Sequence, residues 1–333
     1  MRAPMLRVVT KIVTLGAITC PSGELVLMDG GYLGLWSGDR APEQQRPDEI
    51  PPGVDFEIVG ADAETAARSF DRQVGRTVYD IPERSAADLT ALFDEHCREH
   101  RYSAALRRFE GQVPHRERVR RATAGGEPSF LVSGVPVIVI GGVPTDRPLR
   151  VTASPDEDWG SRHIRLEVST GPAAQRRELG RIGVDNARLV FADADALNAW
   201  VHEDAMDGMA DVVFWGRDEE AVAAEFGASR VGADGFGWLD VPIREAYSKA
   251  VALDAHRNSS AGRLFAYDFR PHSHHWQVMA GVRAAEHEAA TIHVGGADVM
   301  FAMTSVGDGF FPAHVEIGSN GELVAIQITI RTE

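Results

Sequence analysis

The stretch GDGFFPAHVEIGSNGELVAIQITIR, residues 307–331, indicates more about the fold than any other part of the sequence. Asn320-Gly321 stands between two apolar runs, and this pair is favoured in tight hairpin turns because both residues tolerate positive φ. The stretch therefore predicts two antiparallel strands, Phe310–Ile317 and Leu323–Arg331. The second strand alternates between apolar and small or polar side chains, which indicates one buried and one polar face. Its apolar positions are Val324, Ile326, Ile328 and Ile330.

Outward from the hairpin, most other segments are also predicted to be strands. Val8–Ile18 and Glu24–Met28 flank a Pro-Ser-Gly turn and indicate a strand pair. The apolar run Phe130–Ile140 indicates one buried strand, with an edge or a bulge at Pro136. Further predicted strands are Ile164–Val168, Leu264–Phe269, Gln277–Arg283 and Val299–Thr304.

Helices are predicted at fewer places. Ser85–Phe109 has apolar residues at helical spacing, with Ser85 as a candidate N-cap. Asp195–Glu203 and Asp218–Phe226 indicate short helices, and the second is followed by Gly227, a typical helix stop. Four prolines make Asp39–Gly53 a loop.

Strands outnumber helices and do not alternate with them regularly. This pattern predicts an α+β fold with largely antiparallel sheet, a helical insertion and a C-terminal β-hairpin. The predicted division is 1–59 for the N-terminal strands and proline-rich loop of the main domain, 60–126 for the helical insertion, and 127–333 for the main sheet domain. No internal repeat and no glycine-rich phosphate-binding motif is found in the sequence.

Composition restricts the class of partner. The chain has 333 residues, 44% of them hydrophobic, and a formal net charge of -15. A strongly acidic surface repels phosphate backbones, so we expect no nucleic-acid partner. The charge suits a basic protein partner or a small cationic ligand. No apolar run approaches the ~20 residues of a membrane-spanning helix, so no membrane association is expected.

The expected compartment is the cytoplasm. Only Cys20 and Cys97 are present, which suits a reducing environment rather than a disulfide framework. Met1–Lys11 is basic and Ile12–Thr19 is apolar, an arrangement that superficially matches a signal peptide. No cleavage site of the A-x-A kind follows, so we interpret this segment as part of a strand pair that enters the fold.

Three stretches resemble a bacterial protein family of unknown function, catalogued as number 4241. Pro21–Asp29 (PSGELVLMD) is similar to its opening element, and Val184–Asp193 (VDNARLVFAD) to its central stretch. Ser305–Pro312 (SVGDGFFP), followed by Asn320–Val324 (NGELV), resembles its closing hairpin, although Phe311 stands where the family more often has tyrosine. The resemblance implies a shared fold and brings no activity with it.

The first candidate site is a group of aspartates in these stretches. If Asp308 projects from its Gly-Asp-Gly turn, it could meet Asp29, Asp185 and Asp193 in one acidic pocket. Clustered carboxylates bind hard cations such as Mg²⁺ or Ca²⁺, or divide acid and base roles between them, so these four are the candidate catalytic residues. The alternative is that Asp308 only caps its own turn by hydrogen bonding to the backbone.

The second candidate site is the histidine-rich stretch around His272 and His274. On a strand these two side chains would lie on one face and could begin a metal site. His256, His293 or His314 could complete it. The alternative is a polar loop with one or two buried, hydrogen-bonded histidines.

Other patterns have simpler interpretations. His96–His100 (HCREH) matches the H-x-x-E-H pattern of inverted zinc peptidases, but arginines surround it as on a solvated helix face. Cys97 lies in the middle of a predicted helix, where a thiolate is not stabilised. A basic block could bind phosphate or an acidic partner, or be balanced by nearby acids; it consists of Arg107, Arg108, Arg116, Arg118, Arg120 and Arg121.

Two functions therefore stay open. The first is a binding or regulatory protein, including the toxin-neutralising kind, that acts through its acidic surface. The alternative is a metal-assisted hydrolase that uses His272, His274 and the aspartate group with Asp308. The second function implies a divalent metal as cofactor, and the sequence does not decide whether the chain is an enzyme.

Overall fold

The computed structural model describes residues 12–44, 53–70, 75–125, 128–155, 160–232, 235–259 and 263–331. The basic segment Met1–Lys11, the start of the predicted strand Val8–Ile18 and most of the proline-rich loop lie outside the described residues. The chain forms two compact units. Unit 1 combines Met1–Trp200 with Gly281–Glu333, and unit 2 is Val201–Ala280. These boundaries differ from the predicted segments 1–59, 60–126 and 127–333.

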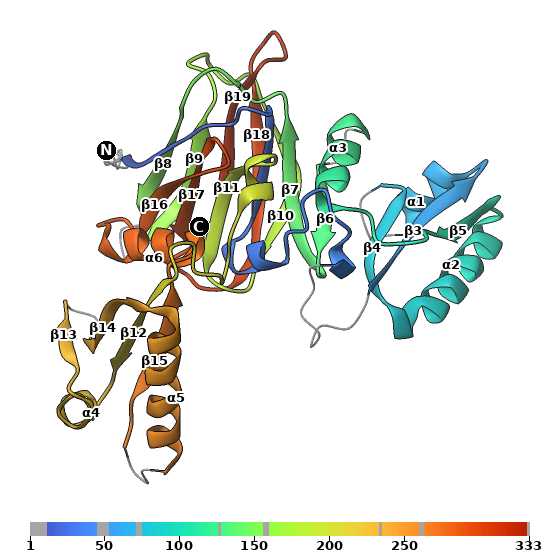
Figure 1. Ribbon diagram of the computed structural model, residues 1–333. Coiled ribbons are helices and arrows are strands. Elements are labelled where there is room, and N and C mark those ends of the chain that lie inside the picture. The colour runs from blue at the N-terminus through green and yellow to red at the C-terminus, as the bar shows by residue number, and fades with distance from the viewer. Residues whose placement is uncertain are drawn as a thin grey trace, which may run out of the picture. The chain divides into compact units, whose positions relative to one another are not determined.

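Unit 1 is built around a sandwich of two six-stranded sheets (Figure 1). All strand pairs in the described residues are antiparallel. The first sheet has the order β1 (Val13–Ile18), β8 (Leu149–Pro155), β9 (Ser161–Glu167), β19 (Leu323–Thr329), β18 (Gly309–Ile317) and β10 (Gln175–Val184). The second has the order β16 (Ala289–Val294), β17 (Ala297–Met303), β11 (Arg188–Asp193), β2 (Glu24–Asp29), β7 (Val135–Gly141) and β6 (Ser129–Val132).

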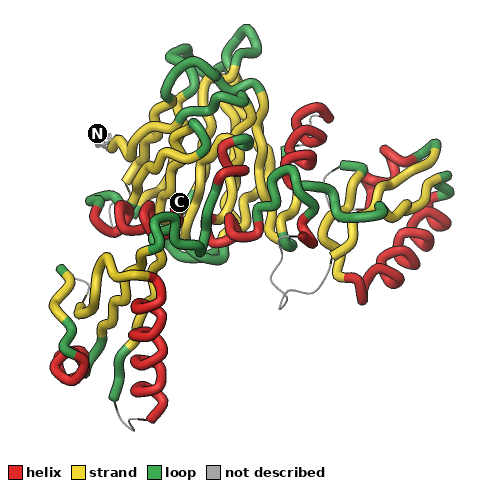
Figure 2. Tube along the Cα trace, viewed as in Figure 1, coloured by secondary structure: helices red, strands yellow, loops and turns green. Residues whose placement is uncertain are grey.

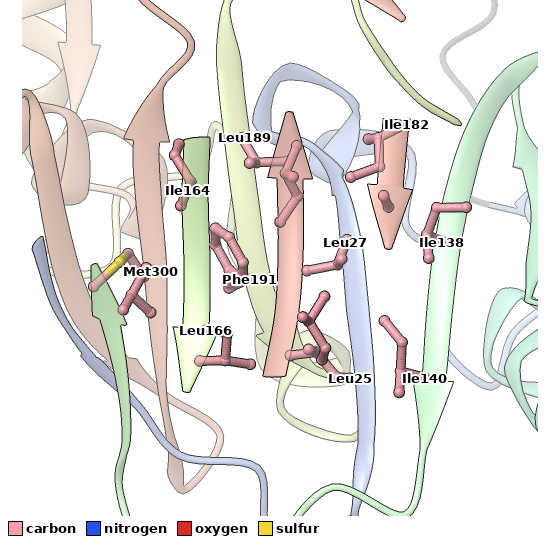
Figure 3. Close-up of a cluster of buried hydrophobic side chains, with 14 of the residues drawn as sticks. Leu25, Leu27, Ile138, Ile140, Ile164, Leu166, Ile182, Leu189, Phe191 and Met300 are labelled. Atoms are coloured by element: carbon pink, nitrogen blue, oxygen red, sulfur yellow. The ribbon is translucent and has the colours of Figure 1, made fainter. Parts of the chain in front are cut away.

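The hydrophobic core of unit 1 lies between these two sheets. Figure 3 shows Phe191 from the second sheet close to Ile164 and Leu166 from the first, and Leu27 from the second sheet belongs to the same buried cluster. All four side chains are almost completely buried. Each such side chain stabilises the fold by about 1.5–3 kcal/mol relative to an exposed one. An α+β class with largely antiparallel sheet is confirmed.

The closing hairpin is formed as predicted. β18 and β19 pair in antiparallel register, with Val315 opposite Ile326. The N–H of Gly321 donates to the carbonyl of Gly318 at 3.1 Å, and Gly321 has a φ of 84°. The second face of β19 is less polar than its sequence indicates. Thr329 is 8% exposed, because β19 lies inside the sheet between β18 and β9.

Two predicted strand arrangements are wrong. β1 and β2 do not pair with each other, since β1 lies beside β8 in the first sheet while β2 lies between β11 and β7 in the second. The run Phe130–Ile140 is two strands rather than one. Ser133-Gly134 turns the chain with φ values of 51° and 83°, and β6 then pairs with β7.

Two other predictions assigned the wrong secondary structure. The predicted helix Ser85–Phe109 is α2 (Ala86–His100), which ends where Arg101 turns left-handed, followed by the strand β5 (Ala104–Arg108). The predicted strand Gln277–Arg283 belongs to the helix α6 (His274–Ala284). Short 3-10 helices are Gly30–Leu35, Pro42–Gln44, Glu83–Ser85 and Ala196–Ala199.

The insertion predicted near 60–126 carries helices together with a small sheet, which we name module 1. It consists of β3 (Gly53–Gly60), α1 (Ala63–Phe70), β4 (Thr77–Pro82), α2 and β5, in the sheet order β4-β3-β5. Its own core contains Phe56 and Phe93. The helix α3 (His115–Gly125) follows module 1 and contacts β6 and β7 of the sandwich.

Unit 2 contains a second small sheet with helices, which we name module 2 (Figure 2). Phe214 and Leu253 lie in its core. Across the described ranges of both units, no helix is long and apolar enough to cross a membrane. The elements of module 2 are β12 (Met209–Trp215), α4 (Glu219–Phe226), β13 (Ser229–Val231), β14 (Gly235–Pro242), α5 (Ile243–Ser259) and β15 (Ala266–Pro271), in the sheet order β13-β14-β12-β15.

Candidate metal centre

Three of the four predicted catalytic aspartates lie around one turn, where each carboxylate accepts at least one hydrogen bond from a neighbouring residue. The carboxylate of Asp29 accepts hydrogen bonds from the backbone N–H groups of Gly31 at 2.7 Å, Asp185 at 2.5 Å and Asn186 at 2.9 Å. Burial raises the pKa of Asp29, and these hydrogen bonds oppose the rise. Asp29 therefore holds two loops together.

Asp185 and Asp308 also accept hydrogen bonds at this turn. The hydroxyl of Tyr32 donates to Asp185 at 2.9 Å, and burial, together with this carboxylate, raises the pKa of Tyr32 to about 12. Asp308 accepts a hydrogen bond from the backbone N–H of Ala187 at 3.0 Å. Asp308 thus caps a neighbouring turn, where the sequence suggested that it caps its own.

Asp193 lies at the opposite end of β11 from this turn. Leu189 is opposite Asp29 in the sheet, whereas Asp193 is opposite Leu25, four positions along the strand. The carboxylate of Asp193 accepts hydrogen bonds from the N–H and the hydroxyl of Ser22, both at 2.7 Å. The structure therefore does not bring the four aspartates into one pocket, and each has a structural role instead.

The two predicted metal-binding histidines also separate. Residues 272–273 form a bend after β15, and His274 begins α6, so the two side chains do not alternate on a strand. The Nδ1 atom of His274 accepts a hydrogen bond from the N–H of Val201 at 2.9 Å, and burial lowers the pKa of this imidazole. His256 lies 3.3 Å from Glu225, and His293 lies 2.9 Å from Asp298.

His272 instead lies among three aspartates of unit 2. Its Nδ1 atom is 2.8 Å from a carboxylate oxygen of Asp207. Its Nε2 atom is 3.2 Å from Asp211 and 3.7 Å from Asp240. One potential ligand atom from each of His272, Asp211 and Asp240 lies within 4.8 Å of the other two. We name these three residues the metal triad.

The backbone of module 2 positions the metal triad. A bulge in β12 falls at Asp211, where the pairing with β14 shifts. Asp240 on β14 has a φ of 51°, and its N–H donates to the Asp211 carboxylate at 2.9 Å. The N–H of His272 donates to the carbonyl of Met209 at 3.0 Å. Two strands, β12 and β14, and the bend that follows β15 in the same sheet therefore bring the three side chains together.

The electrostatics of the site favour a positive charge. Burial alone would lower the pKa of His272, but hydrogen bonds to Asp207 and Asp211 outweigh burial and raise it. The hydrogen bond to His272 lowers the pKa of Asp207. The Asp240 side chain is 80% exposed and that of His272 is 19% exposed, so a cation from solution can reach the carboxylates.

The donor set of the metal triad fits a divalent transition metal. Two ligands each about 2.1 Å from a zinc-like ion are separated by roughly 3.0–3.4 Å, so the 3.2 Å between His272 and Asp211 already suits coordination. The Asp240 carboxylate lies 3.7 Å from the same nitrogen and would have to move slightly to coordinate the same ion. Asp207 on the other ring nitrogen matches the carboxylate–histidine–metal arrangement in which a second carboxylate orients the ligand.

Sequence reasoning found His272 but missed Asp207, Asp211 and Asp240. Each is an isolated acidic residue far from His272 along the chain, and only the pairing of β14 and β15 with β12 brings them together. One signal was available. Asp240-Val241-Pro242 repeats the pattern Asp80-Ile81-Pro82, at the same place in two similar segments.

The other candidate patterns are occupied by structural contacts. Ser69 lies 2.8 Å from the Nε2 atom of His96, and His100 stacks on Tyr102. Cys97 is buried, and desolvation raises its pKa. Each arginine of the basic block has an acidic partner; the pairs are Arg107–Glu57, Arg108–Glu83, Arg116–Glu24, Arg118–Asp80, Arg120–Asp39 and Arg121–Glu117.

Comparisons with protein-family models, with curated proteins and with solved structures give no significant match to this chain. The resemblance of three stretches to family 4241 therefore stays a prediction.

Proposed function

We propose that this chain is a cation-binding protein that holds a divalent metal ion at the metal triad of unit 2. The observation that supports the proposal best is the convergence of an imidazole nitrogen and two carboxylate oxygens within 4.8 Å of one another. His272 would supply the nitrogen ligand, and Asp211 and Asp240 the oxygen ligands. Asp207 would hold the imidazole in the tautomer that leaves Nε2 free to bind.

The ligand types narrow the choice of metal. A site with one imidazole and two carboxylates suits Zn²⁺ or Mn²⁺, whereas Ca²⁺ and Mg²⁺ prefer oxygen ligands alone. Three protein ligands would leave coordination positions for water or for an anionic group. A metal-assisted hydrolase is the alternative function, because a divalent ion makes its bound water more acidic.

The wider role that we propose is that of a binding or regulatory protein in the cytoplasm. The net charge of -15 favours basic protein partners and small cations over nucleic acids. Both cysteines, Cys20 and Cys97, are free and buried, which suits a reducing compartment.

Titration calorimetry on protein purified without a histidine tag tests the metal site. We expect Zn²⁺ or Mn²⁺ to bind with a stoichiometry near one. His272→Gln and Asp211→Asn should abolish this binding. Asp207→Asn should weaken it by about 10–100-fold, because the second carboxylate only orients the ligand.

His256→Gln is the matched control, because His256 is a histidine of the same unit that lies beside an acid outside the metal triad. It should bind metal like the wild type. A stoichiometry near zero in the wild type, or unchanged binding by His272→Gln, would refute the proposed function.

A further inference from the structure

Modules 1 and 2 have the same topology. In each, a first strand lies at the centre of the sheet, a helix leads to a second strand on one side, and a second helix leads to a third strand on the other side. The central strand is β3 in module 1 and β12 in module 2, and both pair antiparallel with their two neighbours. The additional strand β13 extends only module 2.

The two modules also share residues at matching positions. Gly60 is the last residue of the central strand of module 1 and has a φ of 123°, and Gly216 directly follows that of module 2 and has a φ of 132°. In module 1, Asp62 accepts a hydrogen bond from the backbone N–H of Ser103, just before the third strand, at 2.7 Å. In module 2, Asp218 accepts one from the backbone N–H of Leu264 at 2.6 Å. The matching pairs are Asp55 and Asp211, Gly60 and Gly216, Asp62 and Asp218, Phe70 and Phe226, Asp80 and Asp240, Pro82 and Pro242, and His96 and His256.

Asp55 and Asp80 in module 1 are arranged as Asp211 and Asp240 are in module 2. The central strand bulges at Asp55, as it does at Asp211. The N–H of Asp80 donates to the Asp55 carboxylate at 2.8 Å, matching the 2.9 Å hydrogen bond from Asp240 to Asp211. Asp80 has a φ of 56°, close to the 51° of Asp240. We name each of these two arrangements an acid pair.

The acid pair of module 1 binds a guanidinium group that belongs to the chain itself. Arg118 on α3 contacts Asp80 at 2.9 and 3.0 Å and Asp55 at 3.2 Å. The three side chains are almost completely buried, and Arg118 also lies 4.4 Å above the ring of Tyr79. Its remaining N–H groups donate to backbone carbonyls, including that of Leu131 at 2.6 Å.

Module 2 offers the same acid pair to a different group. Phe269 of β15 lies opposite Val212 just as Arg108 of β5 lies opposite Phe56, so the position of His272 corresponds to Gly111 in module 1. Glycine has no side chain to place there, and Arg118 reaches the acid pair from the following helix instead.

We infer that the chain contains one cation-binding module twice, and that module 1 is a guanidinium site occupied permanently by Arg118 as an internal ligand. The acid pair of the module selects a cation. In module 1 that cation is fixed in the chain, and in module 2 the pair faces solvent beside His272. The assignment of module 1 goes beyond the proposed metal site and does not depend on it, because Arg118 contacts both aspartates directly. Only the cation-binding role of module 2 rests on the proposed function.

Chemical rescue of Arg118→Ala tests the inference. This variant leaves the acid pair without its cation, so its unfolding temperature should fall by roughly 6–20 °C, the range for one missing partner of a buried ion pair in a domain of this size. Guanidinium chloride at low millimolar concentration should then raise its unfolding temperature saturably by several degrees, because free guanidinium fills the vacated site. The same concentration should lower that of the wild type slightly or leave it unchanged.

Arg116→Ala is the matched control. Arg116 is a buried arginine of the same helix, but its partners Glu24 and Asp195 do not belong to either module's acid pair. Guanidinium should not rescue it, and tetramethylammonium, which donates no hydrogen bonds, should not rescue Arg118→Ala. If Arg118→Ala does not fold alone, recovery of a cooperative transition with guanidinium supports the inference. Absence of a specific guanidinium effect on Arg118→Ala, in the folded variant or in refolding, overturns it.

Discussion

Asp29 shows how a single carboxylate can matter through the backbone alone. It is fully buried, and its two oxygens accept hydrogen bonds from three backbone N–H groups and from the Asn186 side chain. We expect Asp29→Ala to lower the free energy of unfolding by about 2–4 kcal/mol, because several buried donors lose their acceptor. Urea unfolding measures this loss.

Asp308→Ala is the comparison variant at the same turn. Its carboxylate accepts one exposed hydrogen bond, from Ala187, so the loss should stay near 1 kcal/mol or below. Equal losses in Asp29→Ala and Asp308→Ala would contradict this assignment of roles.

Asp80 should make the protein sensitive to acid. Burial alone would raise the pKa of Asp80, but the charge and hydrogen bonds of Arg118 outweigh burial and lower it. A carboxyl whose pKa is lower in the folded state stabilises the fold above its unfolded value of about 3.9, and this contribution is lost as the pH falls below that value.

The free energy of unfolding should therefore fall more steeply below about pH 4 in the wild type than in Asp80→Asn. The pKa of Asp55 is shifted in the opposite direction, because burial raises it. Asp55 therefore does not contribute to the loss of stability at low pH. Urea midpoints between about pH 3 and 6 measure the difference, and parallel curves for the two proteins would exclude the assigned role of Asp80.

At the scale of elements, the tight exit from β3 depends on Gly60. A Cβ atom there would lie 2.3 Å from the carbonyl oxygen of Ser103, and the φ of 123° is strained for any other residue. We expect Gly60→Ala to cost about 2–4 kcal/mol of unfolding free energy, from strain and from the clash together.

Gly134→Ala separates these two causes, because Gly134 has a φ of 83° but no atom within 4 Å of its added Cβ. It should cost about 1 kcal/mol. Thermal unfolding of both variants measures the difference, and a Gly134→Ala loss as large as that of Gly60→Ala would show that the clash contributes nothing.

Elements with a strong local signal could be predicted from the sequence. Asn320-Gly321 and the alternation after it gave the hairpin β18–β19, and Asp218 and Gly227 bracketed α4. Helix α6 was missed because its apolar residues also fit a strand. The sequence suggested His272 as a metal ligand, but the acidic residues that lie beside its Nε2 atom come from β12 and β14, and no local pattern encodes the pairing of distant strands.

The repeated module was missed for a related reason. Its shared residues are mostly single aspartates and glycines at turns, and each of them alone indicates only a loop. Their common meaning depends on the bulge at Asp55 and Asp211 and on the positive φ of Asp80 and Asp240, which only the structure shows.

At the scale of the whole molecule, the excess of acid should oppose folding at low ionic strength. With a net charge of -15, the excess negative charges repel one another in the folded state. Salt screens this repulsion, because the Debye length falls from about 30 Å at 0.01 M salt to about 8 Å at 0.15 M. We expect the unfolding temperature to rise over this range of sodium chloride, as measured by calorimetry.

The surface ion pairs of the basic block, such as Arg108–Glu83, are half exposed and should add little. An unfolding temperature that falls with salt would mean that these ion pairs outweigh the general repulsion.

The internal ligand of module 1 also restricts which substitutions the protein tolerates during evolution. A change of Arg118 leaves two aspartates buried without a counter-charge, and a change of either aspartate leaves the buried guanidinium short of an acceptor. Related sequences should therefore keep or replace Asp55, Asp80 and Arg118 as a set. The side chain of Asp240 faces solvent and is not subject to this constraint. Substitutions of Asp240 among related sequences should therefore follow the ligand that module 2 binds and not the stability of the fold.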